Sequence, residues 1–176
     1  SIYCKSDFSC YNLYKNKTAV ILGAGKSGLA CGSLLKKKGI KFCYWDENKK
    51  LFPKQDILSY DFFIKSPGIS WQNKVLKQIK RAKKPVFSEL EVAISYLPKG
   101  CKIFAITGSD GKTTTSSIIA ELLKKEGYNV HLGGNIGRAL LPIIEDVKSN
   151  DFAVVELSSF QLISMRTSPD ISVVTN

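Results

Sequence analysis

KIFAITGSDGKTTT, residues 102–115, joins an apolar stretch to a helical pattern through a loop that holds two glycines and a Lys-Thr pair. The backbone amides of such a loop can face phosphate oxygens, and the following helix directs the positive end of its dipole at the anion. Ile106 stands where the longer phosphate-loop pattern has its first glycine, so the loop is the shorter TGxxGKT form. A merely tight strand-to-helix turn would need the glycines but not the Lys-Thr pair.

The phosphate loop predicts ATP and Mg²⁺ as cofactors. Lys112 is spaced to reach the β- and γ-phosphates, and the Thr113 hydroxyl to bind the metal ion. The predicted ATP-binding residues are Ser109, Asp110, Gly111, Lys112, Thr113 and Thr114.

A predicted apolar strand over residues 151–156 carries an acidic residue, Glu156, at its end. In phosphate-loop enzymes a carboxylate at the end of a neighbouring strand holds Mg²⁺ directly or through water. We therefore predict Thr113 and Glu156 as metal-binding residues, and Lys112 and Glu156 as the catalytic pair. The alternative is a carboxylate that caps a helix or loop.

The first half of the chain opens like a dinucleotide-binding fold. An apolar stretch at 17–22 leads into GAGKSG at 23–28 and a helical run over 29–38, and the next strand, 41–45, ends in Asp46. The glycines suit a tight turn, close approach to a phosphate and helix–strand packing, and the acid often marks a ribose site. A further strand at 61–64 ends in Ser66-Pro67-Gly68, where ligands of open α/β folds bind; the alternative is a simple turn.

The remaining elements complete an α/β reading in two domains. Helices are expected over 74–82 and 138–147 and a strand over 85–87, and Ser88 with Glu91 forms a capping box. Residues 97–100, Leu-Pro-Lys-Gly, read as a linker. The expected fold is a Rossmann-like parallel-sheet domain over residues 1–97, followed by a truncated phosphate-loop α/β ATP-binding domain over 98–176.

Composition limits the partners. The 26 Lys and Arg outnumber the 15 Asp and Glu and give a net charge of +11, but they are scattered in twos and threes, so we expect no nucleic acid partner. The five cysteines form no CxxC pair, which favours free thiols in a reducing cytoplasm. No apolar stretch approaches the ~18 residues of a membrane span, and no export signal is visible. We expect a cytoplasmic monomer.

The order of the motifs GxGxxG, SPGI, TGSDGKTT, GGNIG and ELSSFQL resembles the Mur ligases, the ATP-dependent amide-bond ligases of peptidoglycan synthesis. The resemblance covers the whole chain. It implies that the first domain holds a UDP-linked substrate rather than NAD. The substrate-binding residues that it implies are Gly25, Lys26, Ser27, Gly28, Asp46, Glu47, Ser66, Pro67, Gly68, Asn135 and Ser158.

Residues 156–162, ELSSFQL, are most similar to the family member that adds D-glutamate to UDP-N-acetylmuramoyl-L-alanine. The resemblance implies transfer of the ATP γ-phosphoryl group to the substrate carboxylate and attack of the amine on the acyl phosphate. The family usually has Asn where this chain has Asp110, and it continues beyond Asn176 with a further metal-binding histidine, a carbamylated lysine and a C-terminal domain. We therefore expect the 176 residues to bind ligand without turnover.

Other functions stay open at this point. A nicotinamide-dependent oxidoreductase would explain the glycine-rich loop and Asp46 but not the phosphate loop. A non-catalytic nucleotide-binding module would use the phosphate loop without ligation, and another Mur ligase would add a different amino acid.

Overall fold

The computed structural model describes residues 16–134, 140–158, 161–162, 165 and 168–176. These residues form two compact units, one ending at Val92 and the other beginning at Ala93. The division falls inside helix α4 (Glu89–Ser95), whereas the sequence places the linker at 97–100. The boundary after residue 97 stays a prediction, and each unit is described by itself.

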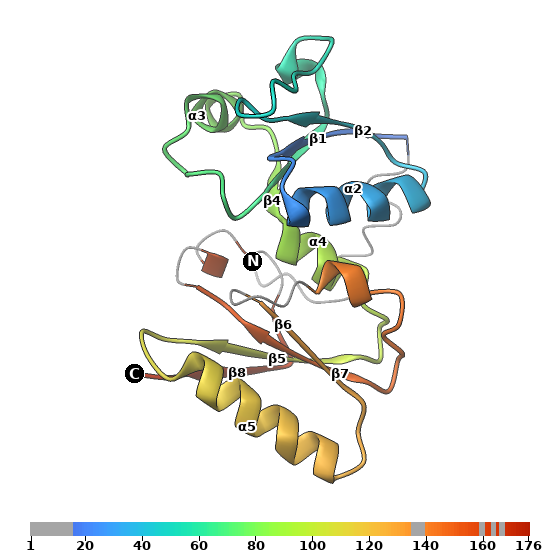
Figure 1. Cartoon of the computed structure of the whole chain (residues 1–176), viewed down its shortest axis with the longest axis vertical. Helices are drawn as coiled ribbons and strands as arrows, with labels where there is room; N and C mark the ends of the chain where they lie inside the picture. Colours follow the sequence, from blue (N-terminus) through green and yellow to red (C-terminus); the bar gives the residue numbers. More distant parts are fainter. Residues whose placement is uncertain (1–15, 135–139, 159–160, 163–164, 166–167) are drawn as a thin grey trace. The chain divides into compact units, whose positions relative to one another are not determined.

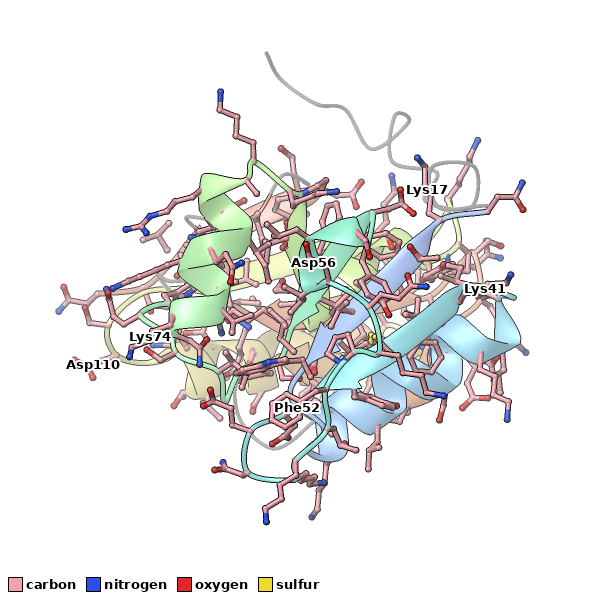
Figure 2. All side chains as sticks on the ribbon, turned by 90° about the horizontal axis from the view of Figure 1, so that it is seen from above. Lys17, Lys41, Phe52, Asp56, Lys74 and Asp110 are labelled. Carbon is pink, nitrogen blue, oxygen red and sulfur yellow. The ribbon has the colours of Figure 1, made fainter. Side chains whose placement is uncertain are left out.

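The first unit is built on a four-stranded parallel sheet, β1 (Thr18–Leu22), β2 (Lys41–Trp45), β3 (Phe62–Lys65) and β4 (Val86–Ser88), in the order β2-β1-β3-β4. Helix α2 (Lys26–Lys37) joins β1 to β2, a short 3₁₀ helix η2 (Ile57–Ser59) precedes β3, and α3 (Lys74–Arg81) joins β3 to β4. Figure 2 shows Lys17 and Lys41 at the amino ends of β1 and β2, and Phe52 beyond their carboxyl ends. The Rossmann-like fold expected for this part of the chain is confirmed.

Strand β1 lies at the centre of this unit, buried on both faces. Val20 and Leu22 pack with Phe63 of β3 and with Leu76 and Ile79 of α3 in one apolar cluster. The alternating β1 residues 19 and 21 are also fully buried and point to the opposite face. Helix α2, which contacts β1 and β2, covers that face, so β1 reads as a continuous apolar run, as expected for a strand covered on both sides.

Helix α4 begins with the predicted capping box. The Glu91 amide donates to the Ser88 hydroxyl (3.1 Å), and the Ser88 amide donates to the Glu91 carboxylate (2.7 Å). This reciprocal pair satisfies two amides that the first helical turn leaves without helical partners.

The second unit holds another parallel sheet, β5 (Lys102–Thr107), β6 (Val130–Gly134), β7 (Phe152–Glu156) and β8 (Ile171–Val174), in the order β6-β7-β5-β8. Helix α5 (Lys112–Lys125) follows β5 and lies along one face of the sheet (Figure 1). The strand–loop–helix unit predicted from residues 102–115 is therefore present.

The prediction of a helix over residues 138–147 is wrong for residues 140–147, the part that the structure describes. From residue 140 onward the chain forms only the 3₁₀ turn η3 (Leu141–Ile143) and further turns. Pro142 would lie inside the expected helix, where it lacks the amide for the hydrogen bond to the preceding turn. The apolar spacing that suggested a helix instead serves burial, because Leu140, Leu141, Ile144 and Val147 are all buried. Among the described residues, no helix combines the length and apolar character that crossing a membrane requires.

Candidate functional site

The phosphate loop lies between the carboxyl end of β5 and the first turn of α5. Gly108 and Gly111 have φ angles of +138° and +76°, a region that favours glycine, and Gly111 is the N-cap of α5. A Cβ atom at Gly108 would also overlap Thr175, whose hydroxyl donates to the carbonyl of Asp110 (2.5 Å). The two glycines thus turn the backbone into a loop at the positive end of the α5 dipole.

Lys112 is the first residue of α5 and folds back over this loop. Its ammonium group donates to the carbonyl oxygens of Gly108 (2.6 Å) and Ser109 (2.9 Å). The cation therefore lies directly beside the amides that would face phosphate oxygens. Asp110, the departure from the family pattern, is exposed, and its amide donates to the carbonyl of Asn176 (2.7 Å).

Glu156 ends β7 and is buried, with 7% of its surface exposed. The Thr113 hydroxyl donates to one carboxylate oxygen (3.2 Å) and the Ser116 hydroxyl to the other (2.6 Å). The structure thus brings together the two residues predicted to bind metal. It also adds Ser116, which the sequence analysis did not single out. Because residues i and i+3 lie on the same face of a helix, the spacing of Thr113 and Ser116 could have indicated that both face Glu156.

The donor set suits a magnesium ion that is held mainly by nucleotide phosphates. Mg²⁺ prefers oxygen ligands and commonly binds one or two carboxylates together with phosphates and waters. A single buried carboxylate and an adjacent hydroxyl at the start of a phosphate-loop helix fit that requirement. Within the described ranges, no group of three or more His, Cys, Asp or Glu side chains is arranged so that it could hold a metal ion.

In the first unit the glycine-rich loop is fastened to the end of β2. The Gly23 amide donates to the Trp45 carbonyl (2.8 Å), and the Ala24 amide donates to the Asp46 carboxylate (2.8 Å). The Lys49 ammonium donates to the carbonyl of the same residue, Ala24. The hydrogen bond from the Ala24 amide is the main reason that the pKa of Asp46 is lowered. Asp46 therefore shapes the loop, and its predicted contact with a sugar stays a prediction.

Ser66 follows β3 and lies against the same glycine-rich loop. Its buried hydroxyl donates to the Glu89 carboxylate (2.6 Å) and also lies 3.2 Å from the Gly23 carbonyl. Pro67 and Gly68, next in the chain, are exposed. Glu89 is a polar residue of this site that no motif in the sequence indicated.

The other predicted substrate-binding residues differ in exposure. Gly25, Lys26 and Glu47 are exposed, Ser27 is half-buried and Gly28 is buried in the first turn of α2. Ser158 follows β7, and its hydroxyl donates to the Gln161 side chain (3.0 Å). Asn135 lies outside the described residues. The structure therefore brings Asp46 and Ser66 against the glycine-rich loop, and Thr113 together with Glu156 at the start of the phosphate-loop helix.

Comparison with known proteins gives the family. Residues 106–176 match the profile of the Mur ligase middle domain. The chain is 44% identical over 169 residues to a UDP-N-acetylmuramoylalanine--D-glutamate ligase of Elusimicrobium minutum, covering 85% of this chain and 37% of that protein. It is 37% identical over 193 residues to the ligase of the same name from Clostridium botulinum (strain Loch Maree / Type A3), covering 98% of this chain and 42% of that protein.

Among solved structures, a UDP-N-acetylmuramate:L-alanyl-gamma-D-glutamyl-meso-diaminopimelate ligase from Neisseria meningitides aligns with 90% of this chain and 60% of its own. The TM-score is 0.47 and the sequence identity 16%. The chain spans about two fifths of the length of the curated relatives above. On its sequence relationships, the chain belongs to the Mur ligase family.

Proposed function

We propose that the chain belongs to an ATP-dependent ligase that joins D-glutamate to UDP-N-acetylmuramoyl-L-alanine. The observation that carries this proposal is the buried Glu156 carboxylate held by Thr113 at the start of the phosphate-loop helix. Two relatives that cover most of this chain bear the name of that ligase, which supports the choice of substrates. The cofactors proposed are ATP and Mg²⁺.

The residues of the second unit would act by position and charge. In the proposed reaction the carboxylate of the L-alanine end attacks the γ-phosphorus of ATP, and the bond to the β–γ bridging oxygen breaks. ADP leaves, and the amine of D-glutamate then displaces phosphate from the acyl phosphate and loses a proton. Two anions meet in the first step, so the Lys112 ammonium and the loop amides lower the barrier by offsetting negative charge.

When bound, Mg²⁺ would supply positive charge that offsets the negative charge of the nucleotide phosphates. Thr113 and Glu156 are the residues that would hold it. Burial of Glu156 and its two hydroxyl donors keep that carboxylate in one orientation before ligand arrives. Such preorganisation avoids reorganisation during the reaction.

The first unit would bind the UDP end of the substrate. Helix α2 begins directly after the glycine-rich loop, with the exposed Gly25 as its N-cap. A Cβ atom at Gly25 would meet nothing within 4 Å, so there is room for a phosphate group to approach the backbone here. Ser27 and the exposed Pro67-Gly68 segment follow the carboxyl ends of β1 and β3, the edge at which open α/β sheets bind ligands. The uridine nucleotide would take the place that a dinucleotide has in related folds.

Calorimetric titration of the chain with Mg·ATP and, separately, with UDP tests both halves of the proposal. Lys112→Ala should weaken Mg·ATP binding about a hundredfold and leave UDP binding unchanged. Lys125→Ala, at the opposite end of α5, is the matched control and should bind Mg·ATP like the parent chain. Binding of NADH in place of UDP, or Mg·ATP affinity indifferent to Lys112, would contradict the proposal.

A further inference from the structure

Glu89 is a buried carboxylate with no part in the function proposed above. It is the first residue of α4, and only 6% of its surface is exposed. Carboxylates are rarely buried to this extent unless they are paired or hydrogen-bonded. The contacts of Glu89 therefore need an explanation.

Those contacts reach both ligand-facing loops of the first unit. The Ser66 hydroxyl, in the loop after β3, donates to Glu89 Oε1 (2.6 Å). The Ser27 hydroxyl, in the first turn of α2 after the glycine-rich loop, also hydrogen-bonds to the Glu89 side chain. The two serines belong to segments about 40 residues apart in sequence, and this one carboxylate joins them.

The space around these bonds is closely filled. The Ser66 side chain lies against Gly23, where a Cβ atom would come 3.0 Å from Ser66 Cβ, and against Gly28, where a Cβ atom would come 3.1 Å from Ser66 Oγ. The Ser66 side chain thus lies where a side chain at either glycine would be, in contact with both ends of the glycine-rich loop. The hydrogen bond to Glu89 holds the Ser66 hydroxyl in its place beside both glycines.

Other charged and titratable groups face Glu89 from the neighbouring elements. Lys65, buried at the end of β3, is the cation that acts on it, and the Lys65 ammonium donates to the Ser66 carbonyl (3.1 Å). The pKa of Lys65 is lowered, mainly by burial, and the positive charge of Lys80 in α3 adds to this effect. The pKa of the Cys31 thiol in α2 is raised, mainly by burial, and the negative charge of Glu89 raises it further. Glu91, on the same helix, is engaged in the capping box with Ser88.

We propose that Glu89 is a positioning residue for the nucleoside diphosphate site: its carboxylate holds Ser27 and Ser66, and through them the two loops, in the arrangement that receives the diphosphate. This inference rests on the proposed function of the first unit. Glu89 itself touches no ligand, and its negative charge is offset by Lys65 and the two hydroxyl donors. The ligand class is a nucleoside diphosphate that presents its phosphates to the α2 N-terminus.

A positioning role differs from a purely structural one in its effect on stability. Burial raises the pKa of Glu89, although Ser66, Ser27 and Lys65 act to lower it. An ionised carboxylate with a raised pKa makes the folded state less stable than a neutral group of the same shape would. Replacement by glutamine should thus maintain or increase stability, while ligand affinity falls because the amide keeps one acceptor oxygen in place of two and lacks the negative charge.

The test is UDP binding by calorimetry together with urea unfolding, using Glu89→Gln and Glu89→Ala. Glu91→Gln is the matched control, since it makes the same chemical change two residues along the same helix. We expect both Glu89 variants to bind UDP about tenfold more weakly, which corresponds to one lost hydrogen bond to a charged group. Glu91→Gln should retain the parent affinity, and the urea midpoint of Glu89→Gln should equal or exceed that of the parent chain.

The outcomes separate this inference from the proposed function. If the parent chain binds UDP and Glu89→Gln binds it equally well while folded, the positioning role is wrong and the UDP site stands. If Glu89→Gln loses affinity only in proportion to lost stability, the residue is structural and the inference fails. If the folded parent chain does not bind UDP, the proposed role of the first unit fails, and this inference with it. Should Glu89→Ala not fold, the glutamine variant decides.

Discussion

At the scale of single residues, the second unit depends on a carboxylate held by two hydroxyls of one helix. Ser116 is 1% exposed and donates to Glu156 Oε1, and Thr113 donates to Oε2. A buried carboxylate that loses a donor keeps its desolvation cost, which makes the loss larger than the value of an average hydrogen bond. Ser116 therefore contributes to stability as well as to the orientation of Glu156.

We predict that Ser116→Ala lowers the free energy of unfolding by about 1–3 kcal/mol. Ser117→Ala, the exposed neighbour on the same helix, should change it by less than about 0.5 kcal/mol. Urea unfolding followed by circular dichroism measures both. Equal midpoints for the two variants would show that the hydrogen bond to Glu156 adds nothing to stability.

Two glycines of the first loop offer a second comparison at this scale. A Cβ atom at Gly28 would overlap the Gly23 carbonyl oxygen, whereas at Gly25 it would meet nothing within 4 Å. Gly28→Ala should therefore cost several kcal/mol of stability, because backbone has to move. Gly25→Ala should leave the thermal midpoint nearly unchanged and weaken UDP binding, since the new methyl group occupies the approach to the loop. A Gly25→Ala chain with full UDP affinity would argue against phosphate binding there.

At the scale of elements, the phosphate loop is held from a distant part of the chain. Strand β8 pairs with β5, and the Thr175 amide just beyond it donates to the Thr107 carbonyl (2.7 Å). The Thr175 hydroxyl reaches the Thr107 and Asp110 carbonyls (3.1 and 2.5 Å). The loop is thus set both by its own glycines and by an edge strand that lies more than 60 residues later in the sequence.

Helix α4 gives an element-scale prediction through its capping box. Ser88→Ala removes the hydroxyl that accepts from the Glu91 amide and should lower stability by about 1 kcal/mol. Ser88→Thr keeps an acceptor at the same position and should recover most of that loss. The two urea midpoints provide the measurement, and identical losses for Ala and Thr would show that the cap is not responsible.

At the scale of the whole molecule, acid stability follows from carboxylates whose pKa values are shifted in opposite directions. The pKa of Asp61 is lowered, mainly by the Thr18 amide that donates to it (2.7 Å), and that of Asp46 by the Ala24 amide. Their stabilisation is present above the unfolded pKa of ~4 and is lost as pH falls through the folded values. Glu89, with a raised pKa, acts in the opposite sense, because its protonation favours the folded state.

We therefore expect the urea midpoint to fall steeply below about pH 4. Asp61→Asn should flatten this slope, since the amide oxygen can still accept from Thr18 but no longer titrates. Glu47→Gln, an exposed change in the same unit, should leave the slope as it is. Midpoints measured from pH 6 to pH 2.5 test this, and a slope unaltered in Asp61→Asn would contradict the assignment.

Local patterns in the sequence predicted most elements and much of the candidate sites. The strands before each glycine-containing loop, the capping box at Ser88 and the fold class were confirmed, because each depends on residues within one or two turns of one another. The helix expected over 138–147 was wrong since Pro142 outweighed the apolar spacing. The domain boundary and the ligand contacts stay predictions.

The sequence by itself determined the two strand–loop–helix units, the glycines that turn their loops and the family to which the chain belongs. The tertiary structure decided which side chains meet: Ser116 with Glu156 across 40 residues, Ser66 with Glu89 across 23, and Thr175 with the phosphate loop across more than 60. The physical reason is that backbone turns depend on neighbours in the chain. A buried polar group, in contrast, finds its partner only when the parallel strands align their carboxyl ends at one edge of the sheet.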